Sequence, residues 1–169
     1  MAKRSRVPAP PIYFNYHDLP TAFADFTGYL LSYVAQMAHR RVDEALEPLD
    51  IDSRQFGVLI LIGETEHRSQ IAISEHMGLD RTHVVRLIDD LERISYVTRE
   101  TDPTDRRYHR LKLTAAGTEA LQKAKQAELI AQEEVYKTFS DEERATFHTL
   151  LLKLTTDSFP ARRNQPDDE

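Results

Sequence analysis

A series of short elements in residues 69–113 constrains the fold more than any other feature of the sequence. Ser69 and Asp80 are residue types that cap helix N-termini, and Gly78 is the type that most often ends a helix. The predicted elements are a helix over 70–77, a turn at Gly78, a helix over 81–94, and strands near 96–100 and 109–113. This order predicts a winged helix-turn-helix.

Longer helices are expected on both sides of this module. A first helix fits residues 21–47, where apolar residues recur at steps of three and four, and Pro48 ends it. The capping boxes Asp52-x-x-Gln55 and Ser140-x-x-Glu143 open two further helices, and a long helix runs from Thr114 to about residue 138. The predicted fold class is mainly α (α+β), a winged helix-turn-helix with N- and C-terminal dimerisation helices.

The terminal helices carry apolar stripes that are too broad for the central module to bury. Their members are Phe23, Phe26, Leu30, Val34 and Met37 on the first helix and Phe147, Leu150, Leu151 and Leu154 on the last. An apolar side chain left in water costs roughly 1.5–3 kcal/mol. A homodimer in which the terminal helices of both copies interlock would bury these stripes, so we expect a homodimer.

Composition changes at both ends of the chain. Residues 1–20 hold four of the eight prolines, so residues 1–18 are expected to form a flexible N-terminal arm, and residues 159–169 a disordered tail. Residues 19–158 are predicted to be a single domain. Its dimerisation helices cover about 19–48 and 114–158, and its winged helix-turn-helix covers about 52–113.

Several classes of function are disfavoured by composition. The chain has no cysteine, which excludes a thiol switch, and its seven histidines lack metal-ligand spacing, so neither metal nor cofactor is expected. It has no glycine-rich phosphate loop and no G-x-S-x-G motif, which argues against an enzyme. No apolar run is long enough for a membrane span or a secretory signal, so we expect a cytoplasmic protein without a membrane partner.

The charge distribution favours DNA as the partner. The whole chain has a net charge of −6, whereas residues 68–113 contain nine Lys or Arg and eight Asp or Glu. The hairpin segment 106–112 holds four cations and no acid. A basic edge on an acidic body would bring one face of the protein to a DNA duplex and repel the others.

Two groups of residues are candidates for DNA contacts. The second helix of the pair offers Arg81, Thr82, His83 and Arg86 to base edges and phosphates of the major groove. Ser69, at the start of the first helix, is a further candidate for a DNA contact. At the hairpin tip, Arg106 and Arg107 could enter a minor groove, and Asp105 could orient a guanidinium by a charge-assisted hydrogen bond. The alternative for the tip is a solvated surface turn, which the helix-turn-helix directly upstream makes less favoured.

These residues resemble the MarR family of bacterial transcriptional regulators. The matching segments are DRTHVVRLIDDLER from Asp80, YVTR from Tyr96, DPTDRR from Asp102 and LTAAG from Leu113. The resemblance implies an obligate homodimer on a pseudo-palindromic DNA operator. It implies that Arg107 enters the minor groove, that Asp105 braces it and that Arg106 has a phosphate or structural role.

The resemblance also implies two structural features near the hairpin. Asp89 and Arg99 match a pair that often forms an internal salt bridge. Ser95 stands where the family usually has glycine, and a serine there is strained if the position is left-handed.

Many members of the family respond to small aromatic or phenolic acids. The residues suited to such an effector are Tyr29, Tyr33, His39, Arg40 and Phe56, which offer rings, hydrogen-bond donors and a cation. The alternative is that the rings pack in a core or dimer interface and that the polar pair lies on a solvated helix face.

The predicted function is that of a ligand-responsive repressor that binds operator DNA as a homodimer and is released by a small effector. A winged-helix protein-interaction module is the alternative from another class. An activator and an effector-independent regulator of the MarR type remain alternatives within the family.

Overall fold

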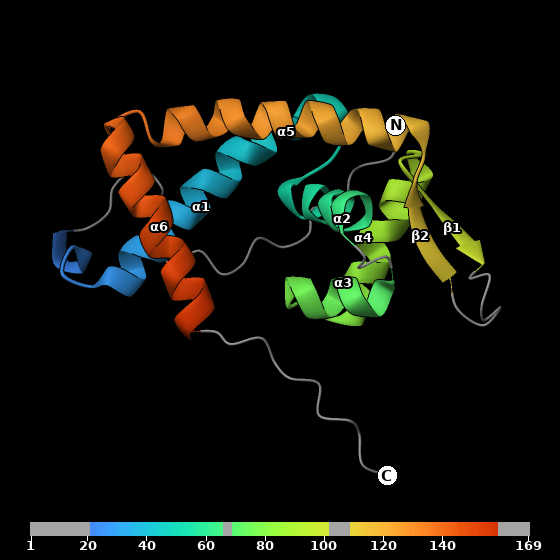
Figure 1. Ribbon diagram of the computed structural model, residues 1–169, viewed down its shortest axis with the longest axis horizontal. Helices are drawn as coiled ribbons and strands as arrows, with labels where there is room; N and C mark the ends of the chain where they lie inside the picture. The colour runs from blue at the N-terminus through green and yellow to red at the C-terminus, as the bar shows by residue number, and fades with distance from the viewer. Residues whose placement is uncertain (1–20, 66–68, 102–108, 159–169) are drawn as a thin grey trace, which may run out of the picture. The chain divides into compact units, whose positions relative to one another are not determined.

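The computed structural model describes residues 21–65, 69–101 and 109–158. Its main elements are α1 (Thr27–Leu46), α2 (Ser53–Glu64), α3 (Gln70–Met77), α4 (Arg81–Arg93), β1 (Val97–Thr101), β2 (His109–Leu113), α5 (Ala115–Val135) and α6 (Asp141–Ser158) (Figure 1). The predicted mainly-α class with one small sheet is confirmed. Contacts within the chain divide it into two compact units, with the boundary between Gln132 and Glu133.

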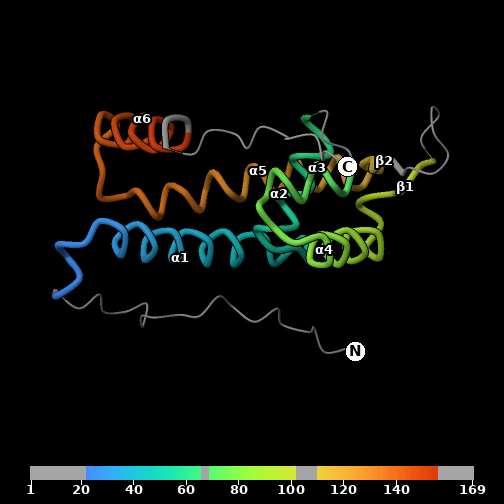
Figure 2. Tube along the Cα trace, turned by 90° about the horizontal axis from the view of Figure 1, so that it is seen from below, coloured from blue at the N-terminus to red at the C-terminus, as the bar shows by residue number. Residues whose placement is uncertain are grey.

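The core of the first unit lies where α2, α3 and α4 meet the hairpin, and these three helices lie side by side in Figures 1 and 2. Helices α2 and α4 contribute the apolar faces that their sequence periodicity predicts, whereas α3 contributes Ile73 and leaves Ile71 exposed. The largest fully buried side chains are Leu46, Val58, Leu59, Ile73, Val84, Ile88, Leu91 and Leu111. The winged helix-turn-helix is therefore built around this core, to which α1 contributes Leu46 and α5 contributes Ala124.

Strands β1 and β2 form an antiparallel hairpin with a register from Val97 opposite Leu113 to Thr101 opposite His109. Val97 and Leu111 are buried, so one face of the ribbon packs on the helices. The second strand has the predicted bounds, whereas the first begins one residue later than predicted. Tyr96 is not part of the strand, because its backbone N–H donates to the carbonyl oxygen of Leu91 at the end of α4, at 2.9 Å.

Helix α4 ends in a Schellman motif with Ser95 in the left-handed conformation. Ser95 has a φ of 63°, and its N–H donates to the carbonyl oxygen of Glu92 at 2.8 Å. The N–H of the next residue reaches Leu91, which completes the two hydrogen bonds of the motif. The chain therefore has a non-glycine residue at a position where glycine is unstrained.

Replacing Ser95 with glycine is expected to raise the free energy of unfolding by about 0.5–1 kcal/mol. Left-handed backbone costs an L-residue roughly 1–2 kcal/mol, and the greater freedom of glycine in the unfolded chain offsets about 0.4–1 kcal/mol of that gain. Urea unfolding measures the difference. Ser95→Ala is the control, because alanine keeps the Cβ atom and should bring no gain; equal gains in both variants would contradict the explanation by strain.

The connection from the hairpin to α5 depends on Thr114. Its backbone N–H donates to the carbonyl oxygen of Tyr96 at 3.0 Å, and its hydroxyl donates to that of Ser95 at 2.7 Å. The same hydroxyl accepts from the N–H of Gly117 at 2.9 Å, so Thr114 caps α5 as predicted. A Cβ atom on Gly117 would lie 1.9 Å from the carbonyl oxygen of Tyr96. Glycine is therefore required for the first turn of α5 to approach the strand.

The first long helix is shorter than predicted. The prediction began it at Thr21, but α1 begins at Thr27, after a 3-10 turn at Thr21–Phe23. Phe26 is extended, with φ −110° and ψ 95°, and it supplies no side-chain cap. The regular apolar spacing continues through this break, so periodicity alone could not reveal it. At its other end α1 passes into the 3-10 turn Glu47–Leu49, which contains the expected Pro48.

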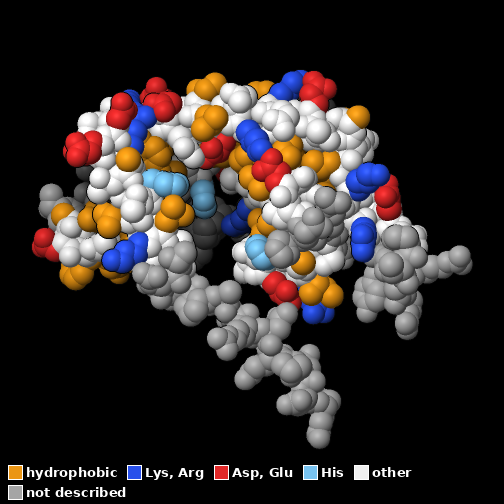
Figure 3. All heavy atoms as spheres, in the orientation of Figure 1, with side chains coloured by type: hydrophobic (Ala, Val, Ile, Leu, Met, Phe, Trp, Pro, Cys, Tyr) orange, Lys and Arg blue, Asp and Glu red, His pale blue; other side chains and the backbone are white. Residues whose placement is uncertain are grey.

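Part of the apolar stripe on α1 is exposed in the single chain. The exposed fractions are 57% for Phe26, 38% for Val34 and 38% for Met37. Exposed apolar side chains on the other long helices are Leu129, Ile130, Leu150, Leu152 and Leu154. Figure 3 shows hydrophobic side chains at the surface of the molecule. These members of the stripes therefore lack full cover among the described residues of one copy.

The second unit contains the turn between α5 and α6. The long helix ends at Val135, three residues before the predicted end, and the rings of Tyr136, Phe139 and Phe147 then pack together with centroids 5.7–6.0 Å apart. The predicted capping box is present, because the N–H of Ser140 donates to Glu143 Oε2 at 2.8 Å and Ser140 Oγ accepts from the N–H of Glu143 at 3.3 Å. The hydrogen bond from the backbone N–H of Ser140 to the carboxylate is the main cause that lowers the pKa of Glu143.

Candidate DNA-binding interface

Helix α4 has one buried face and one exposed polar face. Val84, Leu87, Ile88 and Leu91 are buried and hold the helix on the core. The side chain of Asp80 caps its N-terminus by accepting from the N–H of His83 at 2.9 Å. The buried face and the cap thus fix the first turn on the core, and its exposed face is accessible to a ligand.

The N-terminal half of the exposed face carries the predicted DNA contacts. Arg81, Thr82 and Arg86 are exposed, and His83 is half-buried. Within the described ranges, neither Arg81 nor Arg86 forms an ion pair, so both guanidinium groups are available to phosphates or bases. The Nε2 atom of His83 is buried and has no hydrogen-bond partner among the described residues.

The acids of the same helix lie toward its C-terminal end, and arginines neutralise them there. Asp90 pairs with Arg93 at 3.1 Å, and Asp89 pairs with Arg99 Nη2 at 2.7 Å. Glu92 pairs with Arg99 Nη1. The carboxylates are paired at one end, and at the other end Arg81 and Arg86 pair with no acid in the described part of the chain. Helix α4 therefore presents a basic leading end to a polyanion.

Arg99 fastens the hairpin to α4. It lies on β1, its side chain is one quarter exposed, and it reaches two carboxylates one turn apart on the helix. The salt bridge with Asp89 was predicted, whereas the contact with Glu92 was not. Glu92 lies one turn beyond Asp89 on α4, so helical spacing could have suggested that both face the same cation.

Arg99→Ala is expected to lower the free energy of unfolding by about 1.5–3 kcal/mol, the range for hydrogen bonds to charged groups, because two carboxylates lose their shared cation. Chemical denaturation measures the loss. Arg93→Ala is the matched control, because Arg93 and Asp90 form a pair whose side chains are 68% and 51% exposed. Such exposed pairs contribute about 0–1 kcal/mol. Equal losses in the two variants would contradict the role given to Arg99.

Ser69 is exposed, and its hydroxyl oxygen caps α3 by accepting from the N–H of Ala72 at 3.1 Å. The predicted wing residues Asp105, Arg106 and Arg107 lie outside the described residues, so their DNA contacts stay predictions. On the described part of the hairpin, Lys112 pairs with Glu100 at 3.3 Å.

The aromatic candidates for effector binding on α1 lie near its N-terminus. The ring centroid of Tyr29 lies 4.8 Å from that of Phe23 and 6.2 Å from that of Phe26. Tyr29 is 45% exposed and Tyr33 is half-buried. The contacts of Tyr29 fit aromatic packing as well as a ligand site.

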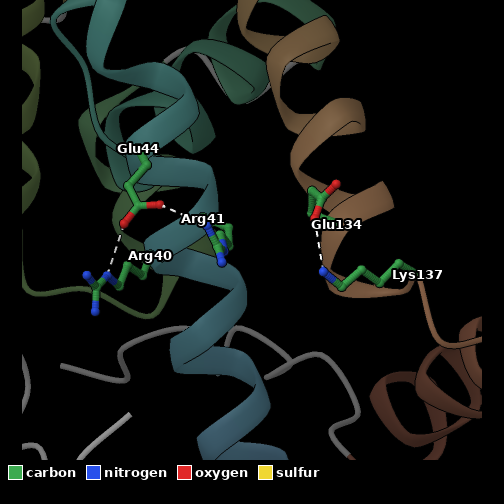
Figure 4. Close-up of polar contacts among 5 residues, drawn as sticks. All are labelled: Arg40, Arg41, Glu44, Glu134 and Lys137. Atoms are coloured by element: carbon green, nitrogen blue, oxygen red, sulfur yellow. Dashed lines mark hydrogen bonds and ion pairs between the residues drawn. The ribbon is translucent and has the colours of Figure 1, made fainter. Parts of the chain in front are cut away.

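The polar candidates lie further along the same helix. His39 and Arg40 are exposed, and Arg40 Nε pairs with Glu44 Oε1 at 3.0 Å. Figure 4 shows the carboxylate of Glu44 between Arg40 and Arg41. Arg41 Nη1 pairs with Glu44 Oε2 at 3.4 Å. The close-up also shows the pair of Glu134 and Lys137 in the second unit, at 3.4 Å.

Phe56 is the member of the predicted effector set that lines a pocket between α2 and α5. The pocket has a volume of about 360 Å³. Its lining residues are Phe56, Ile60, Lys125, Glu128 and Leu129. The structure thus does not bring the four α1 candidates into this pocket, and the predicted effector set stays a prediction.

Comparison with known proteins identifies the family. The MarR family profile matches residues 51–109, and the multiple antibiotic resistance protein MarR of Escherichia coli is 31% identical over 130 residues. That alignment covers 75% of this chain and 89% of the E. coli protein. The chain belongs to the MarR family. This MarR-family chain is a DNA-binding transcriptional regulator with a winged-helix fold, and its family is not one of enzymes.

Other similar proteins support the same assignment to the family. A Thauera aromatica protein, described as a putative transcriptional regulatory protein for the hcr operon, is 34% identical over 99 residues. The alignment covers 59% of this chain and 60% of that relative. The crystal structure of CouR from Rhodococcus jostii bound to p-coumaroyl-CoA has 30% identity and a TM-score of 0.72, covering 83% of this chain and 97% of that one. A mutant of E. coli MarR complexed with operator DNA has 28% identity and a TM-score of 0.69, covering 80% and 99%.

Two further observations concern other kinds of site. No helix in residues 21–65, 69–101 and 109–158 is long and apolar enough to cross a membrane. The same ranges hold no group of three or more His, Asp or Glu side chains placed to hold a metal ion.

Proposed function

We propose that this MarR-family chain is a homodimeric, ligand-responsive repressor of a pseudo-palindromic operator. The charge arrangement of α4 supports the DNA-binding surface: near the N-terminus, Arg81 and Arg86 have no ion pair with any described residue, and near the C-terminus the acids are paired with arginines. In the proposal, α4 enters the major groove and Arg107 of the basic segment 106–112 enters the minor groove. Repression follows from occupation of the operator.

The exposed apolar side chains of the long helices support the homodimer. We infer that residues 19–158 act as one MarR-type domain, with helices at about 19–48 and 114–158 exchanging contacts between two copies. Phe26, Val34 and Met37 are exposed in one copy, and their burial in a dimer contributes about 25 cal/mol per Å² of apolar surface. Sedimentation at micromolar concentration should give a dimer, and a monomer would contradict this part of the proposal.

The salt dependence of DNA binding tests the proposed function against the alternative of a protein-interaction module. Each phosphate that a cation neutralises releases counterions, so the logarithm of the binding constant should fall with the logarithm of salt concentration by about 0.9 per phosphate. Fluorescence anisotropy with a labelled duplex measures this slope. A flat response would favour a protein partner for the winged helix.

CouR, which was solved with p-coumaroyl-CoA, supports a ligand response, and the mutant of E. coli MarR that was solved with operator DNA supports DNA binding. A thermal-unfolding screen against phenolic and aromatic acids, with zinc included, tests the ligand response here. A selective upward shift would identify a compound that favours the folded protein, and operator release by that compound is the expected second result. No shift with any compound would favour an effector-independent regulator. Activation, the other alternative within the family, predicts increased transcription when the operator is occupied.

A further inference from the structure

Tyr96 connects the winged helix-turn-helix to the end of the first long helix. Its hydroxyl donates to the carbonyl oxygen of Leu49 at 3.2 Å, although the two residues lie 47 positions apart in the sequence. Leu49 is the last residue of the 3-10 turn Glu47–Leu49, which directly follows α1. Both residues are half-buried and pack against the core. The hydrogen bond therefore joins the end of α1 to the point where α4 passes into the hairpin.

The backbone of Tyr96 is fixed on both sides. Its N–H donates to the carbonyl oxygen of Leu91 on α4 at 2.9 Å, and its carbonyl oxygen accepts from the N–H of Thr114 at 3.0 Å. The first turn of α5 packs against the same peptide group, since a Cβ atom on Gly117 would lie 2.8 Å from the carbonyl carbon of Tyr96. Tyr96 therefore has little freedom to move relative to α4 and α5.

The side chain of Tyr96 carries this fixed position to the end of α1. A tyrosine has only two side-chain torsions before its hydroxyl, so the ring acts as a rigid spacer. The turn that supplies the acceptor is held as well, because it ends at Asp50, whose φ is 58° and whose N–H donates to the carbonyl oxygen of Glu47 at 3.0 Å. Asp43 Oδ1 on α1 also accepts from the N–H of Ser53, the first residue of α2, at 2.7 Å. A rigid ring between two fixed points sets the distance between the ends of α1 and α4.

Building on the homodimer proposed above, we propose that Tyr96 is a positioning residue that sets the separation of the two α4 helices in the dimer. In that dimer the long helices join the copies and α4 meets the DNA. The position of α4 relative to α1 therefore determines how far apart the two recognition helices lie. Loss of the Tyr96 hydroxyl should widen the range of separations and leave the contacts of each α4 with its half-site in place.

A distance measurement between the two copies tests this directly. The chain has no cysteine, so Arg93→Cys introduces a single site for a spin label near the exposed end of α4. Pulsed dipolar electron paramagnetic resonance of the labelled full chain should give one narrow distribution of distances between the copies. Adding Tyr96→Phe is expected to broaden that distribution, because the ring remains but the hydrogen bond to Leu49 is lost.

Ser74→Ala is the matched control. The Ser74 hydroxyl donates to the carbonyl oxygen of Leu79 at 2.6 Å, so this variant also loses one part-buried bond between a hydroxyl and a carbonyl group. That bond lies within the turn from α3 to α4 and does not reach α1. Ser74→Ala should therefore lower the free energy of unfolding, as Tyr96→Phe does, and leave the distance distribution unchanged. Circular dichroism establishes that each variant is folded.

The spacing preference on DNA gives a second readout. Duplexes with the same two half-sites and different spacer lengths are compared by fluorescence anisotropy, and the unchanged chain should prefer one spacer. Tyr96→Phe is expected to bind that duplex about two- to tenfold more weakly, the equilibrium equivalent of one neutral hydrogen bond, and to discriminate less against the other spacers. A simple loss of folded protein would instead lower the affinity for every spacer by the same factor.

The possible failures of the inference and of the proposed function differ. Identical distance distributions with and without Tyr96→Phe, in a chain that is a dimer, would show that the hydroxyl does not position α4. Equal broadening in Ser74→Ala would assign the effect to general loosening of the winged helix-turn-helix and would also overturn the inference. Absence of a dipolar signal would indicate a monomer and contradict the proposed homodimer on which the inference rests.

Discussion

Gly117→Ala is expected to lower the free energy of unfolding by at least about 2 kcal/mol, toward the upper part of the range for overpacked sites. The added Cβ atom would lie 1.9 Å from the carbonyl oxygen and 2.8 Å from the carbonyl carbon of Tyr96. Both are backbone atoms, so no change of rotamer can relieve the overlap. Either α5 must move away from the hairpin, or the hydrogen bonds of Thr114 to Ser95 and Tyr96 must lengthen.

Gly28→Ala is the matched control for this substitution. Gly28 also lies in the first turn of a long helix, but a Cβ atom there would meet nothing within 4 Å. Alanine is a better helix former than glycine by about 1 kcal/mol in a helix interior, so Gly28→Ala should be neutral or stabilising. Denaturant midpoints compare the two variants. Equal effects would show that the loss at Gly117 is not due to the contact with Tyr96.

Arg81→Ala and Arg107→Ala are expected to impair DNA binding in different ways. Arg107→Ala should weaken binding to the operator by roughly 1–3 kcal/mol and leave the dimer intact, as expected for a wing contact. Arg81→Ala should reduce the discrimination between sequences, because the N-terminal residues of a recognition helix read base edges. Binding titrations with a preferred duplex and with a scrambled duplex separate these effects.

Arg93→Ala serves as the control on the same helix, because Arg93 is paired with Asp90 at the far end from Arg81. It should bind both duplexes as the unchanged chain does. A uniform loss for both duplexes in Arg81→Ala would make Arg81 a phosphate contact. Unchanged affinity in Arg107→Ala would remove that residue from the DNA interface.

Much of the local structure could be predicted because short-range chemistry determines it. Caps depend on a few neighbouring residues, so Asp52, Ser69, Asp80, Thr114 and Ser140 each mark the helix start that the structure shows. The bounds of α3 follow from Ser69 and Gly78 in the same way. The strained conformation of Ser95 could also be anticipated, since the family usually has glycine there.

Features that depend on distant contacts could not be predicted. The ion pair of Lys125 with Glu64 joins residues 61 positions apart, and no local pattern indicates it. The late start of α1 was missed because the apolar spacing before Thr27 resembles that of the helix itself. The effector candidates were selected by chemical type; Phe56 lines the pocket between α2 and α5, and the effector set stays a prediction.

Selection of binding sites from a randomised DNA duplex library tests the central claim most directly. The proposal predicts enrichment of an inverted repeat whose half-sites lie about one helical turn apart, because a two-fold symmetric dimer would place two α4 helices in successive major grooves. It also predicts that Arg81→Ala recovers a less defined sequence. Recovery of no preferred sequence, or of a sequence without inverted symmetry, would contradict a homodimer that reads a pseudo-palindromic operator through α4.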